Sequence, residues 1–393
     1  MLFRGRMGKP TGYWLASYGN MITERPRMGP YARALRQVVR PGCTVLDIGA
    51  GTGIFSLLAC QLGAGHVHAV EPNGAIQVAR QLATANGFSD RITFHQALST
   101  EVCLPTPADV MVSDLRGVLP FFQHHIPSIV DARQRLLASG GVLIPCRDTL
   151  WATLVEDPEL YRPYAEPWLR NDYGLDLSAG QSLVVNTWRK ANAKPDQILV
   201  EPQCWATLDY TNIVTPNVSG ELSWVVERAG TAHGLLVLFG AELVNGIGFP
   251  NAPGEPELIY GQAFFPLQEP VVLEGGDTVI TRLRADLVDD DYVWQWDTQV
   301  MVRGDAGCVK ARFRQSTFHG APISLDQLKQ REAGFIPQRT EAAEITQFVL
   351  SMMDGWTPLG DIAAALTARF PKRFARQQDA LTWAADLAEQ YSR

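Results

Sequence analysis

A glycine-rich turn between a buried strand and a helix is the feature that most constrains the fold of this chain. Apolar residues lead into Asp47, and a helical run begins at Phe55. Between them stand three glycines at two-residue spacing, Gly49, Gly51 and Gly53. Such a turn brings bare backbone and helix-end amides against a ligand. A second apolar strand at residues 66–70 ends in Glu71, where a carboxylate is placed to accept both hydroxyls of a ribose. The pattern predicts a nucleoside-binding site.

Strands and helices alternate along the chain from residue 44 to about residue 145. Segments typical of strands are residues 45–48, 67–70, 92–95, 110–112 and 142–144, and segments typical of helices are residues 56–62, 75–86 and 128–138. This alternation predicts an α/β fold with a parallel sheet covered on both faces. The ligand of such a sheet binds at the carboxyl ends of the strands, where the glycine turn lies.

The pattern changes after Pro145. Short, often alternating segments rich in Trp, Val and Thr continue to about residue 317, which predicts an antiparallel β-barrel or sandwich. Apolar residues at helical spacing then recur from residue 340 to residue 391. We therefore expect four parts, an N-terminal segment at 1–42, a Rossmann-like domain at 43–146, a β domain at 147–320 and a helical or winged-helix-like unit at 335–393.

Composition excludes several classes of protein. The formal net charge of −7 argues against a broad basic face for nucleic acid. No apolar stretch approaches the roughly 20 residues of a membrane span, and no signal peptide is recognisable. The six cysteines are scattered without a C-x-x-C pair, so we expect no structural zinc or other metal, no disulfide framework, and a cytoplasmic location.

The charges around the turn favour one nucleoside cofactor over another. Dehydrogenases use G-x-G-x-x-G, whereas this chain has G-x-G-x-G directly after Asp47. A carboxylate there would repel a pyrophosphate but suits a ligand with an ammonium group. S-adenosyl-L-methionine carries that ammonium and a ribose for Glu71, and it has no phosphate. A purely structural glycine turn remains the alternative.

Further segments resemble known proteins. Residues 45–55, Glu71 and residues 110–114 resemble class I methyltransferases. Four more segments, in order, resemble the protein arginine methyltransferase family, namely residues 13–18 (YWLASY), residues 21–27 with Tyr31, Ala132-Arg133 through Pro145, and residues 171–178 (NDYGLDLS). The resemblance covers residues 13 to about 302. It implies a seven-stranded Rossmann-like methyltransferase sheet followed by an antiparallel β-barrel, N-terminal helices that cap the cofactor, and a homodimer joined by an arm at about residues 165–197.

The same resemblance implies the residues that bind the cofactor. Arg27 would hold the methionine carboxylate by a bidentate pair. Asp47 and the amides of the three glycines would line the amino-acid end, and Glu71 would bind the ribose. Ser99-Thr100 falls where the family contacts adenine, without the acidic residue usual there. A solvated basic helix face is the alternative for Arg27.

The chain departs from the family where the substrate binds. Family members hold the guanidinium with two glutamates on one loop, and here the first position is Asp114 and the second is the neutral Gln123. Arg116 introduces a cation that would disfavour an incoming guanidinium. The family's T-H-W loop falls on Leu258-Ile259-Tyr260, so its histidine, which pairs with an acid of the N-terminal helix, is absent.

Several functions therefore stay open. The first is N-methylation of an arginine or guanidino group of a peptide or protein, with Asp114 contacting the nucleophile and Gln123 and Arg116 shaping the site. The second is N- or O-methylation of a small metabolite or natural-product peptide. The third is a non-catalytic partner subunit that keeps the cofactor fold.

Two remaining features have competing interpretations. His124 or His125 could act as a base, or both could be surface residues on a loop. The C-terminal helical unit faintly resembles the domains that present leader peptides to peptide-modifying enzymes. A tail that covers the β domain or the dimer interface is the simpler interpretation.

Overall fold

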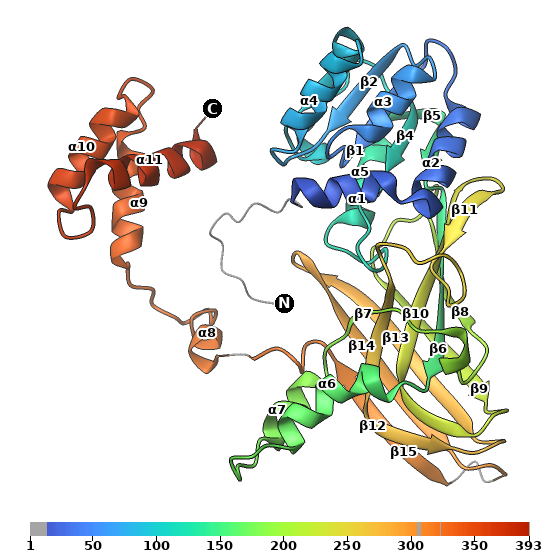
Figure 1. Cartoon of the computed structure of the whole chain (residues 1–393). Coiled ribbons are helices and arrows are strands. Elements are labelled where there is room, and N and C mark those ends of the chain that lie inside the picture. The colour runs from blue at the N-terminus through green and yellow to red at the C-terminus, as the bar shows by residue number, and fades with distance from the viewer. Residues whose placement is uncertain (1–13, 305–307, 323, 393) are drawn as a thin grey trace. The chain divides into compact units, whose positions relative to one another are not determined.

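The computed structural model describes residues 14–304, 308–322 and 324–392, and these form two compact units. The first unit ends at Pro322 and the second begins at Ile323 (Figure 1). Tyr13, the first residue of the aromatic N-terminal segment, lies outside the described residues.

A five-stranded parallel sheet forms the first layer of the first unit, in the order β3-β2-β1-β4-β5. Its strands are β1 (Thr44–Ile48), β2 (His66–Val70), β3 (Ile92–His95), β4 (Ala108–Ser113) and β5 (Leu137–Ile144). The α-helices before and between them are α1 (Leu15–Thr23), α2 (Arg25–Val38), α3 (Ile54–Gln61), α4 (Ile76–Ala85) and α5 (His125–Arg135), with short 3-10 helices at Ser89–Arg91 and Ser99–Glu101. The predicted α/β alternation is confirmed.

The register of this sheet decides which residues meet at its carboxyl edge. Ile48 of β1 pairs with Val70 of β2 on one side and with Ser113 of β4 on the other. The residues that follow these three strands are Gly49, Glu71 and Asp114, and they therefore lie side by side. Residues far apart in sequence become one site because parallel strands end together.

The parallel sheet has five strands and not the seven that the family resemblance implies. After Ile144 the chain enters β6 (Arg147–Val155), which pairs with β10 of the next layer and not with the parallel sheet. No further described strand joins the five. The chain therefore passes from the fifth parallel strand directly into the antiparallel sheets.

The second layer consists of two antiparallel sheets. One has the order β7-β12-β10-β6-β8 with β11 added beside β10, and the other has the order β15-β14-β13-β9. Their remaining strands are β7 (Arg189–Ala191), β8 (Gln203–Asp209), β9 (Val218–Val225), β10 (Gly230–Val244), β11 (Ile247–Pro250), β12 (Gln262–Leu273), β13 (Thr278–Val288), β14 (Asp291–Met301) and β15 (Val309–Ser316). Phe265 of β12 packs against Trp294 and Trp296 of β14, with ring centroids 5.0 and 5.2 Å apart, so the two sheets share a core. Antiparallel β structure is confirmed in this part, and closure of the two sheets into a barrel stays a prediction.

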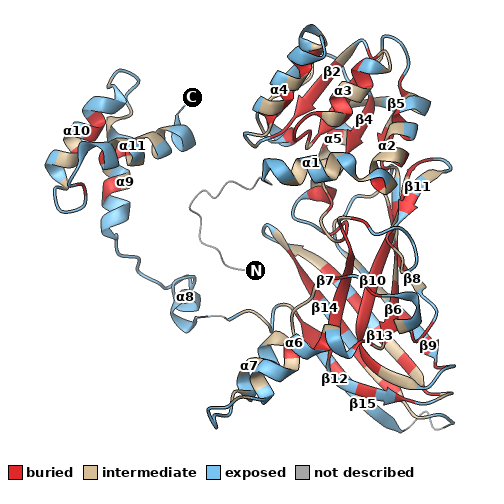
Figure 2. Ribbon diagram, viewed as in Figure 1, coloured by how far each residue is buried: buried red, intermediate tan, exposed pale blue. Residues whose placement is uncertain are grey.

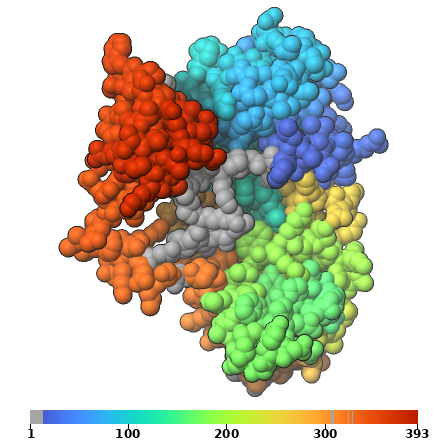
Figure 3. Space-filling model, turned by 60° about the vertical axis from the view of Figure 1, so that its left-hand side comes forward, coloured from blue at the N-terminus to red at the C-terminus, as the bar shows by residue number. Residues whose placement is uncertain are grey.

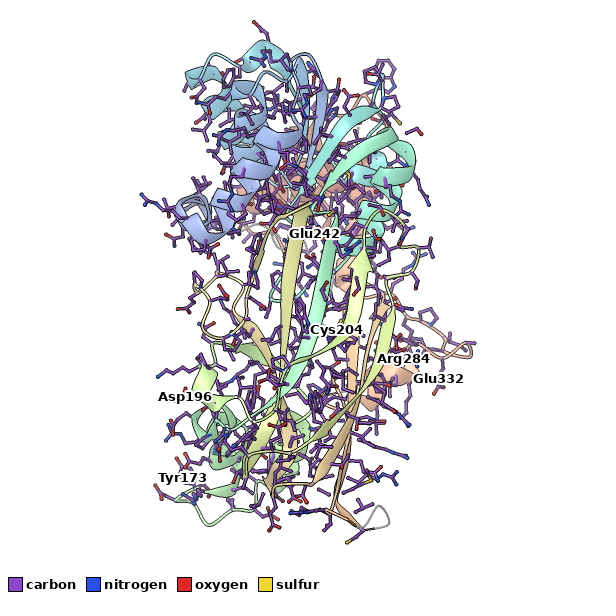
Figure 4. The ribbon with its side chains drawn as sticks, turned by 90° about the vertical axis from the view of Figure 1, so that its right-hand side faces the viewer. Tyr173, Asp196, Cys204, Glu242, Arg284 and Glu332 are labelled. Carbon is purple, nitrogen blue, oxygen red and sulfur yellow. The ribbon has the colours of Figure 1, made fainter. Side chains whose placement is uncertain are left out.

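A helical projection interrupts this β layer where the arm was predicted. It contains α6 (Pro158–Leu169) and α7 (Ser178–Val184), and between them Tyr173 is 82% exposed. Figure 4 shows Tyr173 at the end of the first unit that lies opposite the parallel sheet. Glu242 marks the end of β10 that lies nearest to the parallel sheet. The green segment that holds α6 and α7 lies at the surface in Figure 3.

The second unit is helical throughout its described residues. It contains α8 (Leu325–Lys329), α9 (Glu341–Met352), α10 (Leu359–Arg369) and α11 (Gln377–Tyr391). Its own apolar core includes Ile345, Val349, Leu366 and Phe374. The predicted helical unit is confirmed, but the wing is not, because the described residues after Ile323 form no strand.

Burial follows the sheets, as Figure 2 shows by the red strands of both layers. Among the described residues, no helix is long and apolar enough to cross a membrane. The same residues contain no group of three His, Cys, Asp or Glu side chains suited to a metal ion.

Candidate active site

The glycine turn after β1 adopts a backbone that only glycine reaches easily. Gly49, Gly51 and Gly53 have φ angles of 72°, 54° and 81°. A Cβ atom on Gly51 would lie 2.5 Å from Cε1 of Tyr18, which is on α1. Helix α1 therefore lies directly over the turn, and a side chain at position 51 would push it away.

Asp47 has a carboxylate oxygen without a partner. The residue is fully buried, and its Oδ2 accepts hydrogen bonds from the Ser56 amide at 3.0 Å and from Ser56 Oγ at 2.7 Å. Its Oδ1 is buried with no hydrogen bond among the described residues. Burial raises the pKa of Asp47 to about 7, against the opposing effect of the Ser56 hydrogen bonds. An orphaned buried carboxylate oxygen beside the turn fits a cationic ligand group such as an ammonium.

Glu71 joins the end of β2 to the glycine turn. Its Oε2 accepts the Gly51 amide at 3.0 Å, and its Oε1 accepts the backbone and side-chain amides of Asn73 at 2.9 and 3.0 Å. An ionised carboxylate offers about four acceptor positions, so Oε2 keeps capacity for a hydroxyl. This arrangement fits a ribose, and the predicted contact with two hydroxyls stays a prediction.

Arg27 is held at the edge of this site by three protein partners. Its Nε donates to Glu24 Oε2 at 3.0 Å, its Nη2 donates to the Met21 carbonyl at 2.6 Å, and its Nη1 pairs with Asp114 Oδ2. Burial opposes the charge of Arg27, but the neighbouring Asp114 more than offsets this and raises the arginine's pKa. Three of its five N–H groups are used, so the predicted hold on a cofactor carboxylate would involve the others.

The predicted adenine contacts lie in the 3-10 helix Ser99–Glu101. Ser99 is buried and Thr100 is exposed. Arg135 of α5 donates from Nη2 to the Ser99 carbonyl at 3.0 Å and so fixes this turn. The structure gives Ser99 and Thr100 no further role, and their contact with adenine stays a prediction.

Asp114 has one engaged oxygen and one unpartnered oxygen. Its Oδ2 accepts from Arg27 and, at 2.5 Å, from the hydroxyl of Tyr260. Its Oδ1 is buried and accepts no hydrogen bond from the described residues, with Arg116 Nη1 3.6 Å away. The Asp114 side chain is 9% exposed. A buried carboxylate oxygen of this kind can accept a hydrogen bond from a bound donor without displacing a protein group.

Arg116 is buried beside Asp114, and its predicted role at the methyl acceptor stays a prediction. Its side chain is fully buried, and Nη2 lies 3.0 and 2.9 Å from the two oxygens of Asp148 on β6. Nη1 donates to the hydroxyl of Tyr31 at 3.2 Å. The cation is thus paired inside the protein, where it joins the loop after β4 to the antiparallel layer. The partner was not predictable, because Asp148 lies 32 positions further along the chain.

Gln123 and His124 lie on the exposed part of the same loop. Gln123 has a left-handed φ of 45°, and its side chain is exposed. His124 Nε2 lies 3.0 Å from Asp290, and both side chains are more than half exposed. The surface-loop interpretation therefore holds for His124, and the role of Gln123 toward an acceptor stays a prediction.

His125 belongs to a buried chain of polar groups behind Asp148. Tyr210 donates its hydroxyl proton to Asp148 Oδ2 at 2.6 Å, so the contact of 3.1 Å between His125 Nε2 and the Tyr210 oxygen requires the imidazole to donate. Burial, together with Arg116, lowers the pKa of His125 to about 3. The imidazole is neutral at pH 7 and enclosed, which argues against a role as base.

A pH dependence of stability follows from this neutral imidazole. An unfolded histidine takes up a proton near pH 6.5, whereas folded His125 stays neutral down to about pH 3, so stability falls as the pH drops below 6.5. We expect His125→Gln, which keeps a donor for Tyr210, to remove roughly 2 kcal/mol of the loss between pH 7 and pH 5. Urea unfolding at both pH values, with pH 8 as the reference, measures the difference. Parallel pH curves for the two proteins would contradict the assignment.

Four functional positions were not identified from the sequence as part of the site. They are Glu24, Asp148, Tyr210 and Tyr260. Glu24 had a local signal, because an acid at the N-cap position of α2 lies three residues before Arg27 and within reach of it. The other three come from the antiparallel layer. Tyr260 lies in the segment where the family's T-H-W loop falls, whereas Asp148 and Tyr210 have no signal in the sequence.

Together, the five-stranded sheet, the left-handed glycine turn and the buried carboxylates Asp47 and Glu71 define a class I methyltransferase-like protein. The family model for ribosomal protein L11 methyltransferase matches residues 32–146, which is this part of the chain.

The sequence is similar to a narrower group of methyltransferases, the protein arginine N-methyltransferases. The chain is 30% identical to protein arginine N-methyltransferase 1.1 of Arabidopsis thaliana over 60% of its length and 62% of the relative's. It is 31% identical to protein arginine N-methyltransferase 2 of Homo sapiens over 68% of its length and 66% of the relative's. The aligned part thus spans less than two thirds of these relatives.

Solved structures show the same fold. Arabidopsis thaliana protein arginine methyltransferase 10 superposes with a TM-score of 0.68 at 20% identity, over 77% of this chain and 97% of the other. The Trypanosoma brucei PRMT1 enzyme-prozyme heterotetrameric complex with AdoHcy gives a TM-score of 0.70 at 20% identity, over 77% and 98%. In sequence and in fold the chain is therefore similar to protein arginine methyltransferases, and its parallel sheet resembles the core of class I methyltransferases.

Proposed function

We propose that this protein is an S-adenosylmethionine-dependent methyltransferase that methylates a guanidino nitrogen of an arginine in a peptide or protein. The buried Oδ1 of Asp114, which accepts no hydrogen bond from the described residues, carries the proposal, because it offers an acceptor to a cationic N–H donor at the carboxyl edge of the sheet. The similarity to named arginine N-methyltransferases supports it.

The residues divide the work as follows. The cofactor, when bound, supplies a methyl group on a sulfonium. Asp47 Oδ1 would hold its ammonium, Glu71 its ribose, Arg27 its carboxylate, and Ser99 with Thr100 its adenine. Asp114 would accept an N–H of the substrate, orient one nitrogen toward the methyl group and stabilise the positive charge. Gln123 would add a neutral contact from the exposed loop.

Turnover with matched peptides tests the proposal. We expect release of S-adenosylhomocysteine with arginine peptides and none with the same peptides carrying lysine in place of arginine. Turnover of a metabolite panel without peptide turnover would support the small-molecule alternative. Cofactor binding without turnover of any acceptor would support the non-catalytic partner, an arrangement for which the trypanosome enzyme-prozyme complex offers a structural parallel.

Removal of the Glu71 carboxylate should weaken cofactor binding. Glu71→Gln loses the charge that accepts both the Gly51 amide and a ribose hydroxyl, so we expect the Kd for S-adenosylhomocysteine to rise by about 10- to 100-fold. Isothermal titration calorimetry measures the change. Glu221→Gln, at an exposed residue paired with Arg282 on the β layer, is the matched control and should leave the Kd unchanged. Equal affinities for both variants would argue against the ribose role.

The assembly and location are further parts of the proposal. The exposed apolar side chains of the arm, Leu169, Tyr173 and Leu175, would join two copies as a homodimer. The six cysteines are free, which fits a reducing cytoplasm. Sedimentation of the full chain and of Tyr173→Glu tests the homodimer, which this variant should weaken.

A further inference from the structure

Residues 258–260 lie in the connection between β11 and β12 and contact two residues of the candidate active site, Glu24 and Asp114. The Ile259 amide donates to Glu24 Oε1, and the other oxygen of Glu24 accepts from Arg27 Nε at 3.0 Å. One residue later, Tyr260 donates its hydroxyl to Asp114 Oδ2 at 2.5 Å. The antiparallel layer is therefore joined to α2 by a backbone amide and to the loop after β4 by a phenol.

The ring of Tyr260 is held in a fixed position. The residue is 7% exposed. Its ring lies nearly parallel to that of Phe249, at an interplanar angle of 3° and a centroid distance of 6.3 Å, and meets the Phe239 ring edge-on at 5.5 Å. A buried, packed ring directs its hydroxyl to one place, and that place is Asp114.

The hydroxyl decides which carboxylate oxygen remains available. Arg27 and Tyr260 both donate to Oδ2, whereas Oδ1 accepts from none of the described residues. Burial, with the charge of Asp114 beside it, raises the pKa of the Tyr260 phenol, so the hydroxyl keeps its proton and acts as a donor at pH 7. Without that second donor, the carboxylate could turn about its Cβ–Cγ bond and offer either oxygen.

We infer that Tyr260 is a positioning residue for methyl transfer, which holds Asp114 with Oδ1 directed at the methyl acceptor. This inference rests on the proposed function, since it assigns the orientation of the group that contacts the acceptor. Tyr260 does not itself contact the acceptor in this assignment. The segment that lacks the family's histidine thus orders the site through a different pair of contacts.

Kinetics of Tyr260→Phe test the inference, because this variant keeps the packed ring and removes only the hydroxyl. We expect kcat for an arginine peptide to fall about 10- to 100-fold, with the Kd for S-adenosylhomocysteine changed less than threefold. Tyr161→Phe is the matched control, since Tyr161 is also buried and donates to a backbone carbonyl, that of Gln268, at 2.9 Å outside the site. Tyr161→Phe should keep kcat within twofold. An unchanged kcat in Tyr260→Phe would overturn the inference.

A double-mutant cycle tests the same contact without turnover. Urea unfolding of the parent, Tyr260→Phe, Asp114→Asn and the double variant should show coupling of roughly tenfold in the unfolding equilibrium constant. Additive effects would overturn the inference. If the cycle shows coupling but the parent protein does not methylate arginine peptides, the proposed function fails while the positioning contact stands. The two failures are therefore distinguishable.

Discussion

Asp114→Asn should lower kcat/KM for an arginine peptide by about 10²- to 10⁴-fold. The substitution keeps the size of the side chain and removes its negative charge. The buried Oδ1, which accepts no hydrogen bond from the described residues, loses its strength as an acceptor for a cationic nitrogen and for the proton that this nitrogen gives up. Steady-state release of S-adenosylhomocysteine measures the loss. Asp114 also pairs with Arg27, the predicted ligand of the cofactor's carboxylate, so the Kd for S-adenosylhomocysteine is measured beside the rate and should rise far less than kcat/KM falls.

Asp109→Asn is the matched control for this variant. Asp109 lies on β4, the strand that Asp114 follows, but is exposed, and its carboxylate accepts the Thr44 amide at 2.8 Å. We expect this control to keep kcat/KM within about twofold, because it makes the same change of charge outside the site. Retention of full activity by Asp114→Asn would show that another group contacts the nucleophile.

Arg116→Met should destabilise the protein by about 3–5 kcal/mol. Methionine approximates the length of the lost side chain, but Asp148 would be left fully buried without its cationic partner. The loss is large relative to the total stability of about 5–15 kcal/mol that is typical of a folded domain. Urea or thermal unfolding monitored by tryptophan fluorescence measures it.

The double variant Arg116→Met/Asp148→Asn separates charge from packing. Asparagine keeps an acceptor for the Tyr210 hydroxyl, which lies 2.6 Å from Asp148 Oδ2, but it is neutral. We expect the double variant to recover most of the stability that the single variant loses, because no buried charge remains. If the single variant is as stable as the parent, the pair does not have the structural role that its burial indicates.

These two predictions place adjacent charges of one loop in different roles. Asp114 keeps an unpartnered oxygen at the edge of the sheet, whereas Arg116 is turned inward onto Asp148. The family resemblance predicts both as residues of the acceptor site, Asp114 in place of the first acid of the substrate loop and Arg116 as a cation beside it. Only packing against β6 and the rings of Phe239 and Phe249, whose centroids lie 5.4 and 5.9 Å from the guanidinium, separates them.

The sequence by itself determined the parallel sheet, the glycine turn and the carboxylates beside it. The strand pattern and the positive φ of Gly51 are properties of short stretches of sequence. Asp47 lies within β1 and Glu71 directly follows β2, and the carboxyl ends of these paired parallel strands lie at the same edge of the sheet. Local chemistry therefore predicted the cofactor side of the site.

The tertiary structure decided the acceptor side. Tyr260 reaches Asp114 across 146 positions of sequence, and Tyr210 reaches Asp148 across 62. The chain leaves the parallel sheet after five strands and builds a second layer against it, and that layer supplies these partners. The contact between Tyr260 and Asp114 depends on how the two layers pack together, and the contact between Tyr210 and Asp148 depends on the pairing of β8 with β6. The spacing of these residues in the sequence does not encode which hydroxyl will meet which carboxylate.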